Sequence, residues 1–291
     1  MEPWLCLGSG SIEEFSRNVL ECLCFTFAGS RHAHRFYLRS DHHRIMNNNL
    51  INILGVKVCN FTLEEAFSII ENCVTGDFSE TSSLFFVNTH TLNTSFNNSS
   101  YRQVLNNATW VFGDGTGVRW AAKLQGIKIK SNLNGTDFFP YFFDKTSNRG
   151  HRYYLLGADE ETIKRAAEEA KKLFPGWILA GFHHGYILDK PTTRIVEEIN
   201  NARVDLLLVG MGNPLQEQFI SEHKDLLKVK LIAGTGGLFD YWGSNITRAP
   251  RWLRNLGFEW VHLMLQQKKR ILRYLVGNPL FLLRIFKARF L

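Results

Sequence analysis

The sequence predicts an α/β protein whose mostly parallel sheet is covered by helices on both faces. From residue 50 onward, short apolar segments alternate with amphipathic segments of helical period. Strands that are separated by helices of this length run parallel. Two segments, 154–158 and 206–212, are nearly all apolar. That composition is typical of central strands buried on both faces.

The expected elements follow in a regular order. We expect strands at 51–58, 83–88, 110–114, 152–157, 177–182, 204–212 and 229–237. We expect helices at 61–74, 99–108, 117–125, 159–174, 192–201 and 215–227. Thr62 and Glu65 have the spacing of a capping box for the helix over 61–74. Pro175-Gly176 is expected to end the helix over 159–174.

The two ends of the chain depart from this pattern. Residues 1–45 hold three cysteines and four histidines without sustained periodicity, so we expect a disordered or wrongly assigned leader. A zinc site using Cys22 and Cys24 would have a spacing that matches no structural zinc module. The five cysteines include no Cys-x-x-Cys pair, which favours a reducing compartment. The main domain is expected over 46–244, and a C-terminal appendage over 245–291.

The appendage carries most of the positive charge. From Arg248 onward there are ten bases and one acid, which gives +9, whereas the whole chain is +7 and the rest is therefore 7 − 9 = −2. Aromatic and apolar residues interleave these bases, a pattern typical of segments that lie on anionic membranes and not of nucleic-acid binding. The alternative is packing against the domain or against another subunit, as in a homo-oligomer. We expect Gly277-Asn278-Pro279 to interrupt the helical pattern.

The charge pattern predicts surface contact with a membrane and not a span through it. No run of about 20 apolar residues is present, and no signal-peptide pattern is seen. The expected location is cytoplasmic and peripheral to the membrane.

Polar and glycine residues follow several expected strands. Asn88 and Asp114 end two of them, and glycines recur at Gly157, at 210–213 and at 234–237. In open α/β sheets, ligands bind at the carboxyl ends of the strands, where glycines let backbone amides approach a phosphate. No GxGxxG or GxxxxGK[ST] fingerprint is present, so an NAD or P-loop site is not indicated.

Several blocks together resemble the WecG/TagA/CpsF family of bacterial glycosyltransferases. The resemblance covers about residues 50–270 and rests on these blocks: "ILGVKV", "FFVNTHTLN", "YRQVLNNATWVFGDGTGV", "YLLGADEE", "FHHGY", "DLLLVGMGNPLQEQFI", "GTGGLFDYWG" and "RAPRWLRNLGFEW". The closing "RYLVGNPLFLLR" is similar to members that build exopolysaccharides.

The resemblance implies a Rossmann-like fold and an inverting sugar transfer. The expected donor is a UDP-sugar, of N-acetylmannosamine type or related, and the acceptor is a polyprenyl-diphosphate-linked sugar at the inner face of the cytoplasmic membrane. No metal and no cofactor are implied. The appendage is expected to help membrane docking and to complete the site.

The resemblance also implies roles for single residues. Asp114 takes the place of the general base, Asn88 that of a strand-end asparagine, Gln216 that of a glutamine near the donor, and Arg248 that of an arginine after the glycine-rich turn. Further donor-site residues are expected at Thr89, His90, Gly157, His184, Gly210, Gly212, Thr235, Gly236 and Gly237.

Each of these assignments has a plainer alternative. Asp114 could be only the first polar residue of a tight turn, and Asp240 is the rival base unless it caps its own turn. Gln216 and Arg248 could be surface residues. His183 and His184 could be ordinary loop residues.

Two positions depart from the family pattern. Phe86 stands where some members have a threonine, and Leu263 stands where an arginine is expected to contact the diphosphate. Either another cation takes over that contact, or the protein is a catalytically impaired nucleotide-sugar-binding scaffold or regulatory subunit.

Overall fold

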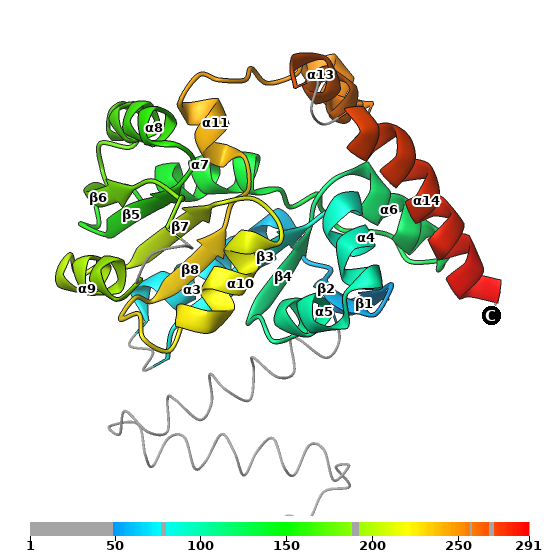
Figure 1. Ribbon diagram of the computed structural model, residues 1–291, viewed down its shortest axis with the longest axis horizontal. Helices are drawn as coiled ribbons and strands as arrows, with labels where there is room; N and C mark the ends of the chain where they lie inside the picture. Colours follow the sequence, from blue (N-terminus) through cyan, green and yellow to red (C-terminus); the bar gives the residue numbers. More distant parts are fainter. Residues whose placement is uncertain (1–48, 77–79, 188–191, 257, 268–270, 291) are drawn as a thin grey trace, which may run out of the picture. The chain divides into compact units, whose positions relative to one another are not determined.

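The computed structural model describes residues 49–76, 80–187, 192–256, 258–267 and 271–290. Leu50–Leu291 form one compact unit, shown in Figure 1. The expected leader over 1–45 lies outside the described residues.

The expected mostly parallel sheet is confirmed. Within the described ranges, eight strands form one sheet in the order β1-β2-β4-β3-β8-β7-β5-β6. Only β1 and β2 pair antiparallel, and every other neighbouring pair is parallel. The strands are β1 (Leu50–Ile53), β2 (Val56–Cys59), β3 (Ser82–Val87), β4 (Trp110–Gly113), β5 (Arg152–Gly157), β6 (Ile178–His183), β7 (Leu206–Gly210) and β8 (Leu231–Gly234).

The single strand expected over 51–58 is instead a hairpin. Leu54 and Gly55, between β1 and β2, have φ values of 52° and 85°. Positive φ at both central residues is the geometry of the tight turns that join antiparallel strands. The prediction was wrong because apolar residues on both sides of the turn read as one continuous run.

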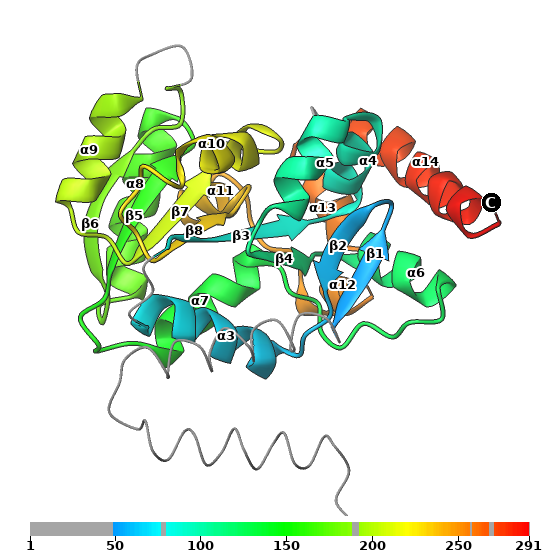
Figure 2. The ribbon, with the colours of Figure 1, turned by 90° about the horizontal axis from the view of Figure 1, so that it is seen from below.

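Helices cover both faces of the sheet, as expected. Figure 2 shows α3 and α7 on one side, and α4, α5, α9 and α10 on the other. The helices of the main domain are α3 (Leu63–Thr75), α4 (Thr89–Asn97), α5 (Ser99–Asn106), α6 (Thr116–Leu124), α7 (Gly135–Lys145), α8 (Glu160–Leu173), α9 (Thr193–Asn201), α10 (Leu215–His223) and α11 (Leu238–Trp242). The appendage adds α12 (Arg251–Asn255), α13 (Glu259–Gln266) and α14 (Ile271–Phe290).

The capping box of α3 forms as its spacing predicts. The Glu65 amide donates to Thr62 Oγ1 at 3.1 Å, and the Thr62 amide donates to Glu65 Oε2 at 2.7 Å. Two orphan amides at the start of the helix are satisfied in this way.

Helix α7 was not expected from the sequence. Its aromatic residues favour helix only weakly, and Pro140 removes one backbone donor inside it. Four phenylalanines of α7 are nevertheless buried against the sheet and its neighbours: Phe138, Phe139, Phe142 and Phe143. Burial of these rings outweighs the local propensity.

Helix α14 runs unbroken through Gly277-Asn278-Pro279, so the expected interruption is wrong. Tertiary contacts hold the helix in place on α4. Asn93 Nδ2 donates to the Gly277 carbonyl at 2.7 Å, and Arg284 Nη1 donates to the Asn93 carbonyl at 3.0 Å. Phe281 and Ile285 are buried in the same core as the strands.

Within the described residues, none of the helices combines the length and hydropathy needed to cross a bilayer.

The docking of α14 can be tested with one buried and one exposed residue on the same helix. Phe281→Ala should lower the free energy of unfolding by about 3–5 kcal/mol, because it leaves a cavity in the core. Leu283→Ala should change it by less than about 0.5 kcal/mol, because Leu283 is 68% exposed. Urea denaturation measures both. Equal losses would contradict the observed orientation of α14.

Candidate active site

Asp114 and Asn88 lie next to each other because β4 and β3 are neighbours in the sheet. The Asp114 amide donates to the carbonyl of Val87 at 2.8 Å. The Asn88 side chain hydrogen bonds to the Asp114 carboxyl group. The Asn88 oxygen meanwhile caps α4, accepting from the amides of His90 at 3.0 Å and Thr91 at 3.2 Å. One asparagine therefore starts a helix and holds the candidate base.

Asp114 lies in a site that disfavours its charge. Burial raises the pKa of Asp114 to about 7, and the negative charges of Glu259 and Asp137 add to that effect. Arg248 and the hydrogen bond from Asn88 act in the opposite direction. A carboxyl group with such a pKa changes its charge close to neutral pH.

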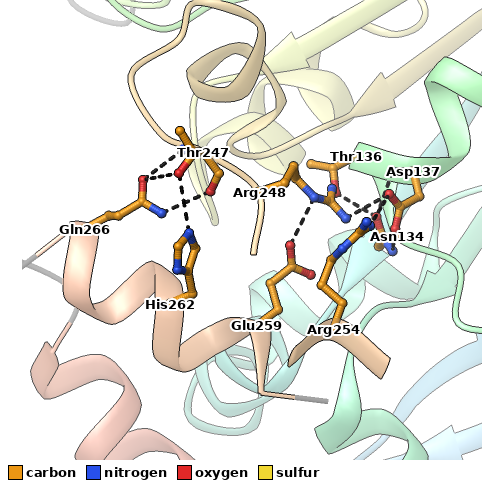
Figure 3. Close-up of polar contacts among 9 residues, drawn as sticks. All are labelled: Asn134, Thr136, Asp137, Thr247, Arg248, Arg254, Glu259, His262 and Gln266. Atoms are coloured by element: carbon orange, nitrogen blue, oxygen red, sulfur yellow. Dashed lines mark hydrogen bonds and ion pairs between the residues drawn. The ribbon is translucent and has the colours of Figure 1, made fainter. Parts of the chain in front are cut away.

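Arg248 joins the appendage to the main domain, as Figure 3 shows. Its Nη2 lies 2.8 Å from Asp137 Oδ1, and its Nε lies 3.1 Å from Glu259 Oε1. Its Nη1 also donates to the hydroxyl of Thr136, and its guanidinium lies 5.3 Å from the ring centre of Tyr241. Arg248 is therefore ion-paired on both sides, and its side chain is 25% exposed.

The first turn of α7 fixes the Asp137 carboxylate. Asn134 Oδ1 accepts from the Asp137 amide at 2.8 Å, and Asn134 Nδ2 donates to Asp137 Oδ2 at 2.8 Å. The other carboxylate oxygen, Oδ1, faces Arg248 and lies 3.5 Å from Arg254 Nη1. Sequence reasoning missed both Asp137 and Glu259, because neither follows a strand. The Asn134–Asp137 spacing, which resembles a helix cap, is the signal that could have indicated the first.

The start of the appendage is tied to α13 by a second set of contacts. Gln266 Oε1 accepts from the Thr247 amide at 2.8 Å, and Gln266 Nε2 donates to the Thr247 carbonyl at 3.0 Å. Residue 247 therefore sits against α13 directly beside Arg248, as Figure 3 shows. Leu263, on α13, brings no charge to the site.

The glycine-rich turn after β8 lies on the same edge of the sheet. The Gly236 amide donates to Gln216 Oε1 at 3.0 Å. The Thr235 amide and hydroxyl both donate to the Val209 carbonyl, at 2.7 Å and 3.1 Å. The Gly236 amide and the Thr235 amide and hydroxyl thus hold the turn after β8 in place. Gln216 is 1% exposed, so the alternative that it is a solvated surface residue is wrong.

Two other predicted glycines allow close packing of backbones. A Cβ atom on Gly157 would overlap the backbone of Gly210, and one on Gly210 would lie 2.7 Å from the ring of Phe239. The Gly212 carbonyl accepts from the Gln216 amide at 3.0 Å, and Gly237 directly precedes α11. These glycines shape the ends of β5, β7 and β8.

The remaining predicted residues divide into near and distant ones. Thr89 opens α4, and a Cβ atom on Gly117 would overlap its hydroxyl, so the N-termini of α4 and α6 lie together. His183 is the last residue of β6, and His184 begins the loop that follows. In the sheet order, β6 lies four strands away from β3. His183 Nδ1 lies 2.8 Å from the His184 carbonyl. The structure does not bring His184 to Asp114.

Asp240 has the contacts of a residue that holds a turn. Its carbonyl accepts from the amides of Asn245 at 2.8 Å and Ile246 at 3.2 Å. Its carboxylate Oδ1 lies 3.4 Å from Asn245 Nδ2. This geometry favours the capping alternative for Asp240.

In the part of the chain that the structure describes, no group of three or more His, Cys, Asp or Glu side chains could hold a metal ion. The polar centre consists instead of Asp114, Asp137 and Glu259 around Arg248.

The raised pKa of Asp114 predicts how stability changes with pH. The folded carboxyl keeps its proton up to about pH 7, whereas the ordinary value is 3.8, so the unfolded chain binds fewer protons between these values. The contribution of Asp114 is therefore complete below pH 4 and is lost as the pH rises to 7.

Asp114→Asn removes this loss of stability at high pH, because asparagine does not ionise. It should raise the free energy of unfolding at pH 8 by roughly 1–3 kcal/mol and change it little at pH 4. Urea denaturation at the two pH values measures the difference. A gain of equal size at both would show that the Asp114 charge is not the cause.

Comparisons with known proteins show the family of this chain. The model of the glycosyl transferase WecG/TagA/CpsF family matches residues 51–291. An N-acetylglucosaminyldiphosphoundecaprenol N-acetyl-beta-D-mannosaminyltransferase from Staphylococcus aureus is 30% identical over 246 residues, or 84% of this chain and 94% of the relative. Proteins of the same name from Bacillus spizizenii and Bacillus subtilis are 30% and 29% identical. They cover 65% and 64% of this chain, and 73% and 72% of the relatives. The chain thus belongs to the WecG/TagA/CpsF family of glycosyl transferases.

Proposed function

We propose that this protein is an inverting glycosyltransferase. It would move an N-acetylmannosamine-type sugar from a UDP-sugar to a polyprenyl-diphosphate-linked N-acetylglucosamine in surface polysaccharide biosynthesis. The names of the relatives supply the transferred sugar and the acceptor. The observation that carries the proposal is the desolvated Asp114 carboxyl, on the same edge of the sheet as the turns after β8 and β7.

Asp114 is the general base of the proposed reaction. Its ionised carboxylate takes the proton of the acceptor hydroxyl, whose oxygen forms a bond to the anomeric carbon of the donor. The bond between that carbon and the diphosphate oxygen breaks, and UDP leaves with the electron pair. Attack from the face opposite UDP inverts the configuration and needs only one carboxylate. A pKa near 7 suits a base that works at neutral pH.

Arg248 and Arg254 supply the positive charge that the leaving diphosphate requires. Both lie at Asp137, within 2.8 Å and 3.5 Å of its Oδ1. A bound diphosphate competes with the carboxylates of Asp137 and Glu259 for the two guanidinium groups. Guanidinium groups suit paired phosphate oxygens. They replace the arginine that the family pattern puts at Leu263, which supports an active enzyme over an impaired scaffold.

The outer face of α14 supports docking on the anionic inner surface of the cytoplasmic membrane. Phe281 and Ile285 face the core, whereas a stripe of apolar residues three or four positions apart faces away from it. This stripe consists of Leu272, Leu275, Val276, Leu280, Leu283 and Phe286, which are 39–74% exposed. An exposed apolar stripe on a basic helix is typical of segments that lie in a membrane interface.

The transfer can be measured as UDP release from UDP-N-acetylmannosamine in the presence of an N-acetylglucosamine diphosphate lipid. Asp114→Asn should lower kcat by about 10²–10⁴-fold, because the acceptor proton has no base. Asp240→Asn is the matched control and should stay within about threefold of the wild type, because the backbone carbonyl of Asp240 holds its turn and is unchanged by the substitution.

Near-normal turnover by Asp114→Asn would remove that residue from the role of base. UDP binding without UDP release by the wild-type protein, across several hexose donors, would favour the scaffold alternative.

Membrane docking can be tested by co-sedimentation with vesicles that contain anionic lipid. The double variant Leu272→Asn/Leu283→Asn should bind at least about tenfold more weakly, because two apolar side chains leave the interface. Leu173→Asn/Leu226→Asn is the control, since these leucines are also exposed but lie outside the appendage. If the first pair changed the oligomeric state and not lipid binding, the stripe would be a subunit contact.

A further inference from the structure

A buried carboxylate that the proposed reaction does not use is linked to the glycine-rich turn 234–237 through one side chain, that of Gln216. Glu217, in the first turn of α10, is fully buried. The side chains that donate hydrogen bonds to it are neutral: Tyr101, Asn213 and Gln216. Burial raises the pKa of Glu217 to about 7, and the hydrogen bonds from these side chains act against that rise. A buried charge without a cation partner is costly, so its placement needs a reason.

The three donors divide between the two carboxylate oxygens. Gln216 Nε2 donates to Glu217 Oε1 at 2.8 Å, and Asn213 Nδ2 donates to the same oxygen. The Tyr101 hydroxyl donates to Oε2 at 3.0 Å. The oxygen that faces Gln216 is thus distinct from the one that faces Tyr101.

The other end of the Gln216 amide holds the glycine-rich turn. Gln216 Oε1 accepts from the Gly236 amide at 3.0 Å. The side chain also packs against Gly234, where an added Cβ atom would be 3.1 Å from Nε2. Gly236 has φ +58°, a conformation that favours glycine. The side-chain amide of Gln216 therefore contacts the turn at both Gly234 and Gly236 and helps to fix its conformation.

A side-chain amide can be turned end for end, because its oxygen and its NH2 group have nearly the same size. Glu217 Oε1 accepts hydrogen bonds from Asn213 Nδ2 and from Gln216 Nε2, so this oxygen requires the NH2 end of Gln216 on its side. In the reversed orientation, oxygen would face oxygen at Glu217, and NH2 would face the N–H of Gly236. The carboxylate of Glu217 thus selects the one orientation in which Gln216 holds Gly236.

We propose that Glu217 is a positioning residue for donor binding: it acts through Gln216 to hold the Gly236 amide and so to shape the turn 234–237 for the diphosphate of the nucleotide. This inference rests on the proposed function, which puts the diphosphate at this edge of the sheet.

A double-mutant cycle on the full chain tests it, with UDP as the probe and calorimetry as the readout. Gln216→Leu and Glu217→Leu should each weaken UDP binding by about tenfold, since each releases the Gly236 amide. The double variant should bind no more weakly than Gln216→Leu alone, because Glu217 acts only through Gln216. Losses that add up to about a hundredfold would overturn the inference.

Two control variants separate orientation from general stability. Tyr101→Phe removes the donor on the other carboxylate oxygen, so it should lower the melting temperature and leave the Kd for UDP within about twofold. Glu217→Gln keeps an oxygen toward Gln216 and should also stay within about twofold. If Glu217→Gln were as weak as Glu217→Leu, the charge and not the acceptor would matter, and the inference would fail. Glu217→Asp, with a shorter reach, replaces Glu217→Leu if that variant does not fold.

Hydrogen exchange at the Gly236 amide gives a readout without ligand. Exchange should be faster in Glu217→Leu, or in Glu217→Asp if that variant is used, and unchanged in Tyr101→Phe. Unchanged exchange in a folded Glu217 variant would overturn the inference. A wild-type protein that does not bind UDP would instead contradict the proposed function, and the exchange measurement would still decide the role of Glu217.

Discussion

The ion pairs of Arg248 hold the site together. This one guanidinium lies between Asp137 at the start of α7 and Glu259 at the start of α13, two segments far apart in the sequence. Both carboxylates raise the pKa of Asp114, and Arg248 lowers it. The appendage is therefore part of the electrostatic environment of the candidate base.

Helix α4 connects the candidate base with α14. Asn88 caps the first turn of α4 and hydrogen bonds to Asp114. Further along α4, Asn93 and Asn97 accept hydrogen bonds from Arg284 of α14 at 2.9 Å and 2.8 Å. A lipid-linked acceptor that arrives along the α14 stripe would thus meet elements packed directly against the site.

The sequence predicted the parallel sheet and most crossover helices, because buried strands and amphipathic helices have different periods. It also predicted that Asn88 and Asp114 end strands. It did not predict α7, where aromatic burial overrides propensity, or the continuity of α14 through Pro279, which depends on contacts with α4. Asp137, Glu259 and Glu217 were missed because their roles arise from tertiary contacts and not from a position after a strand.

The proposed role of Asp114 requires that its ionised carboxylate receives the proton of the acceptor. The dependence of kcat/KM on pH in the wild-type enzyme, measured with saturating acceptor and varied donor, is the decisive test. We expect low values at pH 5 and a rise through one inflection near the pKa of about 7. A profile that is flat from pH 5 to 9, or an unchanged inflection in Asp114→Asn, would rule out Asp114 as the base.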